Sequence, residues 1–125
     1  MLQLTTIIFF IAFSLLALIH VIAIRLALYW HFLWLDMPVH CLGGIVVALG
    51  FFTLRDLGLF PNKFLKLLPL IGLVLCIALI WEAFELFIGV PIVGNYFTDT
   101  ASDIGMGLIG GVLGYFIGTS LRNLH

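Results

Sequence analysis

The chain has 125 residues, of which 64% are hydrophobic and 9% are charged, and its formal net charge is −1. Soluble domains usually contain about 45–50% apolar and about 25% charged residues, so this composition excludes a soluble globular protein and a disordered one. Five Lys and Arg residues are too few for the basic surface of a nucleic-acid-binding protein. Cys41 and Cys76 lie in apolar runs without the spacing of metal ligands, which argues against a disulfide framework or a zinc knuckle.

Four segments are long and apolar enough to cross a membrane, because about 30 Å of hydrocarbon takes roughly 20 helical residues. Backbone polar groups in lipid must be paired within the segment, so each is predicted to be a helix. We therefore expect an all-α fold, a four-transmembrane-helix bundle that forms a single domain over residues 1–125. The predicted helices cover about residues 4–28, 37–54, 65–88 and 102–121.

An aromatic link joins the first two predicted helices. It contains Tyr29, Trp30, Phe32 and Trp34 within a few residues. Aromatic side chains are enriched where a membrane meets water, so we expect this link to lie along the membrane surface.

The basic residues predict the orientation. With four crossings, both termini and the loop after the second helix lie on one side, which holds Arg55, Lys63, Lys66 and Arg122. The other side holds only Arg25, so both termini are predicted to be cytoplasmic, in the cell membrane. Asp56 adjoins Arg55 in the cytoplasmic loop, where a solvated surface charge accounts for it.

The other five acidic residues all fall on the predicted outer side. Residues three or four apart share one face of a helix, so each helix after the first can aim one polar pair at the same point. The pairs are Asp36 and His40, Glu82 and Glu85, and Asp99 and Asp103. The sequence therefore predicts a polar site near the outer surface, provided that these faces point inward.

So many carboxylates close together cannot all stay ionised without compensation. Either some of them are protonated or a cation is bound, and we favour the cation. Oxygen ligands with one imidazole suit a divalent ion such as Mg²⁺, Mn²⁺ or Ca²⁺, with Zn²⁺ as a further possibility. The candidate metal ligands are Glu82, Glu85, Asp99, Asp103 and His40.

Glycines crowd the last predicted helix in three spacings of the GxxxG type. Such small residues let helix backbones approach closely. They predict either close contact with the other helices of the chain or a face for a homo-oligomer. The glycines are Gly105, Gly107, Gly110, Gly111, Gly114 and Gly118.

Three sequence elements resemble those of YjdF-like and VanZ-like small integral membrane proteins. Asp36-Met-Pro-Val-His40, followed by Gly43-Gly44, resembles a D-x-x-x-H-x-x-(G/F)-G element. Trp81-Glu82-Ala-Phe-Glu85 is similar to the WExxE element of the YjdF-like branch. Asp99-Thr-Ala-Ser-Asp103 resembles a D-x-x-x-D-x-x-x-N-x-x-G element, with Gly107 in place of the Asn.

The resemblance covers about residues 36–118 and implies a membrane-embedded helical fold. VanZ-like proteins are linked to glycopeptide tolerance, and enzymes that act on lipid or polyprenol head groups have been suggested for the wider group. The six acidic and histidine residues of the three pairs occupy the polar positions of that family.

The first functional hypothesis is a metal-dependent enzyme that hydrolyses or transfers phosphate-bearing lipid or polyprenol head groups. A divalent cation polarises phosphoryl oxygens. His40, oriented by Asp36, would act as general acid or base, and Glu85 or Asp99 would activate water or an acceptor hydroxyl.

Three further residues are candidates for substrate binding: Arg25, Asn95 and Tyr96. Each has a simpler alternative, which is snorkelling to the interface for Arg25 and turn formation for the other two. The alternative functions are a cation or proton carrier, and a non-catalytic, metal-stabilised membrane scaffold or antibiotic-tolerance factor.

Overall fold

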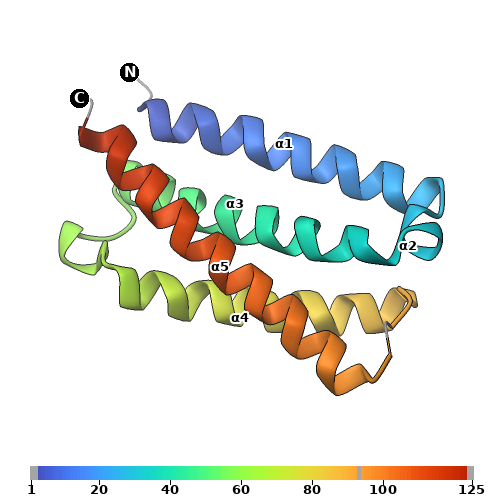
Figure 1. Ribbon diagram of the computed structural model, residues 1–125. Coiled ribbons are helices and arrows are strands. Elements are labelled where there is room, and N and C mark those ends of the chain that lie inside the picture. The colour runs from blue at the N-terminus through green and yellow to red at the C-terminus, as the bar shows by residue number, and fades with distance from the viewer. Residues whose placement is uncertain (1–2, 93, 124–125) are drawn as a thin grey trace.

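A computed structural model describes residues 3–92 and 94–123, and 86% of the chain is helical, with no strand in the described part. Two 3₁₀ turns, Leu33–Leu35 and Asn62–Phe64, join longer elements. The α-helices are α1 (Leu4–Arg25), α2 (Leu28–His31), α3 (Asp36–Asp56), α4 (Leu67–Ile88) and α5 (Tyr96–Asn123), as Figure 1 shows. The predicted all-α four-helix bundle is confirmed.

Four of these helices, α1, α3, α4 and α5, are long and apolar enough to cross a membrane. A helix of 22 residues, such as α1 or α4, extends about 33 Å, which matches a hydrocarbon layer of about 30 Å. The length and composition of the helices therefore indicate a multi-pass membrane protein.

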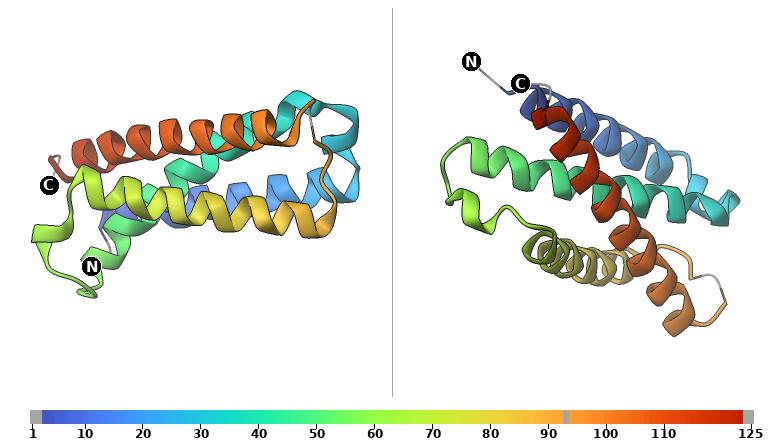
Figure 2. Two further views of the ribbon diagram at one scale, coloured as in Figure 1. Left: turned by 90° about the horizontal axis from the view of Figure 1, so that it is seen from below. Right: turned by 60° about the vertical axis from the view of Figure 1, so that its left-hand side comes forward.

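The helix α3 lies at the centre of the bundle. It packs against α1 on one side and against α5 on the other, and α4 packs mainly on α5. The helix α5 runs obliquely across α3 and α4 (Figures 1 and 2). The start of α1 and the end of α5 lie at one end of the bundle, which we call the terminal end (Figures 1 and 2). The helix α2 and the α4–α5 connection lie at the opposite end, which we call the α2 end.

The glycine face of α5 is used inside the chain. A Cβ atom added to Gly114 would lie 2.6 Å from Ala48 Cβ, and one added to Gly118 would lie 2.6 Å from Phe52 Cε2. A Cβ atom on Gly110 would overlap the backbone carbonyl of Cys41. These glycines therefore let α5 approach α3. An oligomer through the same face stays a prediction, and it would have to displace these contacts.

Several helix ends differ from the predicted ones. The helix α5 begins at Tyr96 rather than near residue 102, because the Asn95 side-chain Oδ1 accepts a hydrogen bond of 2.7 Å from the Phe97 N–H and so caps the helix. This early start places Asp99 inside the first turn of α5. The helix α1 ends at Arg25, where the chain turns through Ala27 into α2, and α4 begins at Leu67 rather than near residue 65.

The aromatic link folds as α2 and the first 3₁₀ turn. Trp30, Phe32 and Trp34 are 45–65% exposed, as expected at a membrane surface. Tyr29 instead turns inward and is 1% exposed, in a core cluster with Ala23 and other apolar residues at the α2 end.

The expectation for Asp56 was wrong. Its side chain is 8% exposed and forms an ion pair with Arg122 of α5. The reason is the length of α5, whose 28 residues bring Arg122 alongside the last turn of α3 at the terminal end.

Candidate functional site

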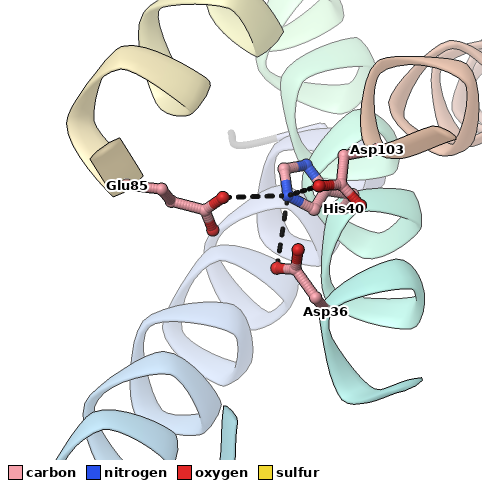
Figure 3. A group of neighbouring side chains, drawn as sticks. All are labelled: Asp36, His40, Glu85 and Asp103. Atoms are coloured by element: carbon pink, nitrogen blue, oxygen red, sulfur yellow. Dashed lines mark ion pairs between the residues drawn. The ribbon is translucent and has the colours of Figure 1, made fainter. Parts of the chain in front are cut away.

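The functional candidate is a group of carboxylates around the imidazole of His40. His40 Nε2 lies 3.3 Å from Asp36 Oδ1, 3.4 Å from Glu82 Oε1, 3.5 Å from Glu85 Oε2 and 3.9 Å from Asp103 Oδ2. Figure 3 shows three of these carboxylates turned toward the ring nitrogen. The side chains come from α3, α4 and α5, so the predicted meeting of three helices at one point is confirmed for these five residues.

All five side chains are buried, and Asp103 is only 1% exposed. Among the residues that the structure describes, His40 Nε2, Asp36 Oδ1, Glu82 Oε1 and both Asp103 carboxylate oxygens have no hydrogen-bond partner. A buried polar atom without a partner costs about 1–3 kcal/mol, and more where the group is charged. The arrangement therefore calls for either shared protons or a bound cation.

Four of the residues lie close enough together to hold a metal ion. Asp36, His40, Glu85 and Asp103 each offer one ligand atom, and these atoms all lie within 4.8 Å of one another. Ligands on opposite sides of a cation lie about 4–5 Å apart, because each metal–oxygen distance is about 2.0–2.6 Å. We call these four residues the cation cluster. Asp36, expected only to orient His40, belongs to it.

Two predicted metal ligands lie outside the cation cluster. Glu82 remains 3.4 Å from His40 Nε2, and Asp99 lies one turn before Asp103 on α5. Glu82, Glu85, Tyr96 and Asp99 line a cavity of about 200 Å³, together with Leu86 and residues 89–92 of the α4–α5 connection. We call this space the polar cavity. It places Asp99 and Tyr96 beside the cation cluster.

The other two predicted substrate-binding residues do not line the polar cavity. Asn95 caps α5, and Arg25 is an exposed residue in the last turn of α1. Their roles in binding a substrate stay predictions.

A series of hydrogen bonds and ring contacts connects Glu85 with α1 and α2. Trp81 Nε1 donates a hydrogen bond of 2.8 Å to Glu85 Oε1, and the His20 ring meets the Trp81 ring edge-on at 4.8 Å. His20 Nδ1 in turn shares a hydrogen bond of 2.9 Å with the Tyr29 hydroxyl. Neither Trp81 nor Tyr29 is among the site residues predicted from sequence. The signal for Trp81 is its position four residues before Glu85, on the same helix face.

The Tyr29 hydroxyl belongs to α2, outside the membrane-spanning helices. Burial raises the pKa of Tyr29 well above its usual range, and the nearby carboxylates of Asp36 and Glu85 raise this pKa further. The hydroxyl therefore stays protonated and keeps its hydrogen bond to His20.

Comparisons of the chain with protein-family models, with curated proteins and with solved structures found no match. The resemblance to YjdF-like and VanZ-like proteins therefore stays a prediction.

Proposed function

We propose that this protein binds one divalent cation through the cation cluster and uses it to act on the phosphate group of a membrane lipid, by hydrolysis or head-group transfer. The observation that carries the proposal is the set of buried ligand residues from three helices, of which His40 Nε2, Asp36 Oδ1 and both Asp103 carboxylate oxygens lack hydrogen-bond partners in the described part of the chain. Such atoms are the ones that a cation would satisfy.

The charges favour a cation over shared protons. Four carboxylates surround a single imidazole, and among the described residues no Lys or Arg forms an ion pair with any of them. A divalent ion would supply two opposite charges at the point where the oxygen atoms converge. Three carboxylates and one imidazole suit Mg²⁺ or Mn²⁺, and Zn²⁺ accepts the same ligand types.

The depth of the site suits a lipid phosphate. Asp36 is the first residue of α3, and His40 lies about 6 Å further along the helix axis, so the cation cluster lies near the end of a membrane-spanning helix, where we expect the lipid head groups. The distribution of basic residues supports placing the α2 end on the outer side of the cell membrane.

The chemistry needs a base beside the cation. Because His40 Nε2 points into the cation cluster as a ligand, the acid–base role passes to Glu82 or Asp99 on the polar cavity. The carboxylate takes a proton from water or an acceptor hydroxyl while the oxygen attacks phosphorus. The bond from phosphorus to the leaving oxygen then breaks, and the proton passes to that oxygen. The cation would polarise the phosphoryl oxygens and offset their charge.

The first test is Mn²⁺ binding by the purified protein in nanodiscs, stripped with EDTA and titrated by electron paramagnetic resonance. Asp103→Asn removes one ligand with almost no change in volume, and we expect the Mn²⁺ affinity to fall at least about 100-fold, the upper range for losing an outer-shell partner. Asp56→Asn, at the terminal end, is the matched control and should keep Mn²⁺ binding. Absence of Mn²⁺, Mg²⁺ and Zn²⁺ binding by the unmodified protein would refute the proposal in favour of shared protons.

The second test is turnover. Vesicles that contain phosphatidic acid, phosphatidylglycerol or polyprenyl diphosphate are incubated with the protein and Mn²⁺, and the products are measured by mass spectrometry. We expect a product that EDTA abolishes and that Asp103→Asn does not form. Metal binding that only raises the melting temperature would instead indicate a scaffold, and cation flux into liposomes would indicate a carrier.

A further inference from the structure

An apolar cavity of about 210 Å³ adjoins the cation cluster on the side of the terminal end. Its wall includes His40 itself, together with side chains from α1, α3 and α4, among them Leu16, Val47, Val74 and Trp81. The proposed chemistry does not use this space. We call it the chain cavity.

The two cavities lie on opposite sides of the cation cluster along the bundle axis. From His40 to Val47 on α3, and from Trp81 to Val74 on the antiparallel α4, the chain cavity extends about 10 Å toward the terminal end. The polar cavity is instead lined by residues at or beyond the level of Glu82, toward the α2 end. The order along the axis is therefore an apolar cavity, the cation ligands, and a cavity whose wall carries Glu82 and Asp99.

We infer that the chain cavity binds one hydrocarbon chain of the substrate, so that the substrate is a lipid whose phosphate follows directly on that chain. This inference rests on the proposed function and specifies its substrate class. The order of chain, phosphate and head group in such a lipid matches the order of chain cavity, cation cluster and polar cavity. An apolar cavity of about 150 Å³ already holds a benzene molecule, so this larger one accommodates a segment of a chain.

The contact between the two sites is direct. His40 lines the chain cavity, and its Nε2 lies 3.3 Å from the Asp36 carboxylate. Trp81 likewise lines the chain cavity and donates its N–H to Glu85. A hydrocarbon chain in the chain cavity would therefore end beside the cation cluster, which would hold the phosphate of the lipid.

One position allows the cavity to be filled without disturbing the helices. Gly43 lines the chain cavity, and within the described part of the chain a Cβ atom added there would meet nothing within 4 Å. Gly43→Leu should therefore project its side chain into the chain cavity. Gly72→Leu is the matched control, because Gly72 is an exposed residue of α4 whose added Cβ also meets no described atom within 4 Å.

The experiment measures the affinity of Mn²⁺-loaded protein, held in amphipol, for ethyl, butyl and hexyl phosphate by isothermal titration calorimetry. For the unmodified protein and for Gly72→Leu, we expect the affinity to rise up to about fourfold for each added methylene that enters the cavity. For Gly43→Leu, we expect the affinity for ethyl phosphate and for Mn²⁺ to be unchanged and the rise with chain length to be lost.

The outcomes separate the inference from the proposed function. If the unmodified protein binds ethyl phosphate in an Mn²⁺-dependent way but without any rise with chain length, the inference is overturned and the proposed function stands. An equal rise in Gly43→Leu and Gly72→Leu also overturns the inference. If no alkyl phosphate binds with Mn²⁺ present, the proposed function fails and the inference fails with it.

Discussion

The contact between α3 and α5 at Gly110 decides where Asp103 lies. Gly110 faces the backbone carbonyl of Cys41, and this backbone atom cannot rotate away as a side chain can. Gly110→Ala must therefore push the two helices apart. Gly105→Ala is its control on the same helix, because a Cβ atom there meets no described atom within 4 Å.

The expected magnitude follows from the comparison of the two variants. Replacing Gly by Ala in a helix gains about 0.8–1 kcal/mol, and this gain is common to both variants. Forcing an extra carbon atom into a packed contact costs about 1–3 kcal/mol. We therefore expect the free energy of unfolding of Gly110→Ala to be about 1–3 kcal/mol below that of Gly105→Ala.

Unfolding in mild detergent, followed by tryptophan fluorescence and circular dichroism, gives the stability of each variant. Mn²⁺ titration gives the second readout, because separation of α3 from α5 draws Asp103 away from His40, which lies 3.9 Å from it in the native chain. Gly110→Ala should bind Mn²⁺ more weakly than Gly105→Ala. Equal stability and equal Mn²⁺ affinity in the two variants would show that the close approach of α5 does not position the site.

Three further predictions concern the surroundings of the site and the opposite end of the bundle. Trp81→Phe keeps a ring beside His20 but removes the hydrogen bond to Glu85, so the Mn²⁺ affinity should fall about 10–100-fold in the same titration. An unchanged Mn²⁺ affinity would show that this hydrogen bond does not orient Glu85. Arg122→Gln leaves the buried Asp56 carboxylate without its ion pair and should lower the free energy of unfolding by about 1–3 kcal/mol. The Mn²⁺ affinity should stay unchanged, because this ion pair lies at the terminal end. A loss of Mn²⁺ binding would contradict the view that the ion pair acts independently of the cation cluster. Folding raises the pKa of Tyr29, so its contribution to stability is complete below its unfolded pKa of about 10 and is lost as the pH rises through the higher folded pKa. The free energy of unfolding of Tyr29→Phe, measured over the same alkaline range, should depend less on pH than that of the unmodified protein. An equal dependence would show that protonation of the buried Tyr29 hydroxyl does not contribute to stability.

The sequence was sufficient to predict the bundle and most of the site. Four apolar segments of membrane-spanning length leave few alternatives to four helices. The spacing of Asp36 from His40, and of Glu82 from Glu85, places each pair on one helix face, and the energetic cost of charged groups in lipid turns such faces inward.

Other features depend on the three-dimensional arrangement and had no local signal. The ion pair between Asp56 and Arg122 joins residues that are 66 positions apart, and it forms only because α5 runs the full length of the bundle. The inward turn of Tyr29 depends on the reversal of the chain at Ala27, where φ is +54°. The chain cavity arises from the spacing of whole helices, which no short sequence element encodes.

The helix α1 is less buried than the other three long helices, since only 6% of its membrane-spanning window is buried. It packs mainly on α3, and its His20 ring meets Trp81 of α4. Because α1 also contributes Phe13 and Leu16 to the chain cavity, we expect this wall of the cavity to separate at the smallest energetic cost. A lipid entering there would move sideways from its own leaflet and would never have to cross water.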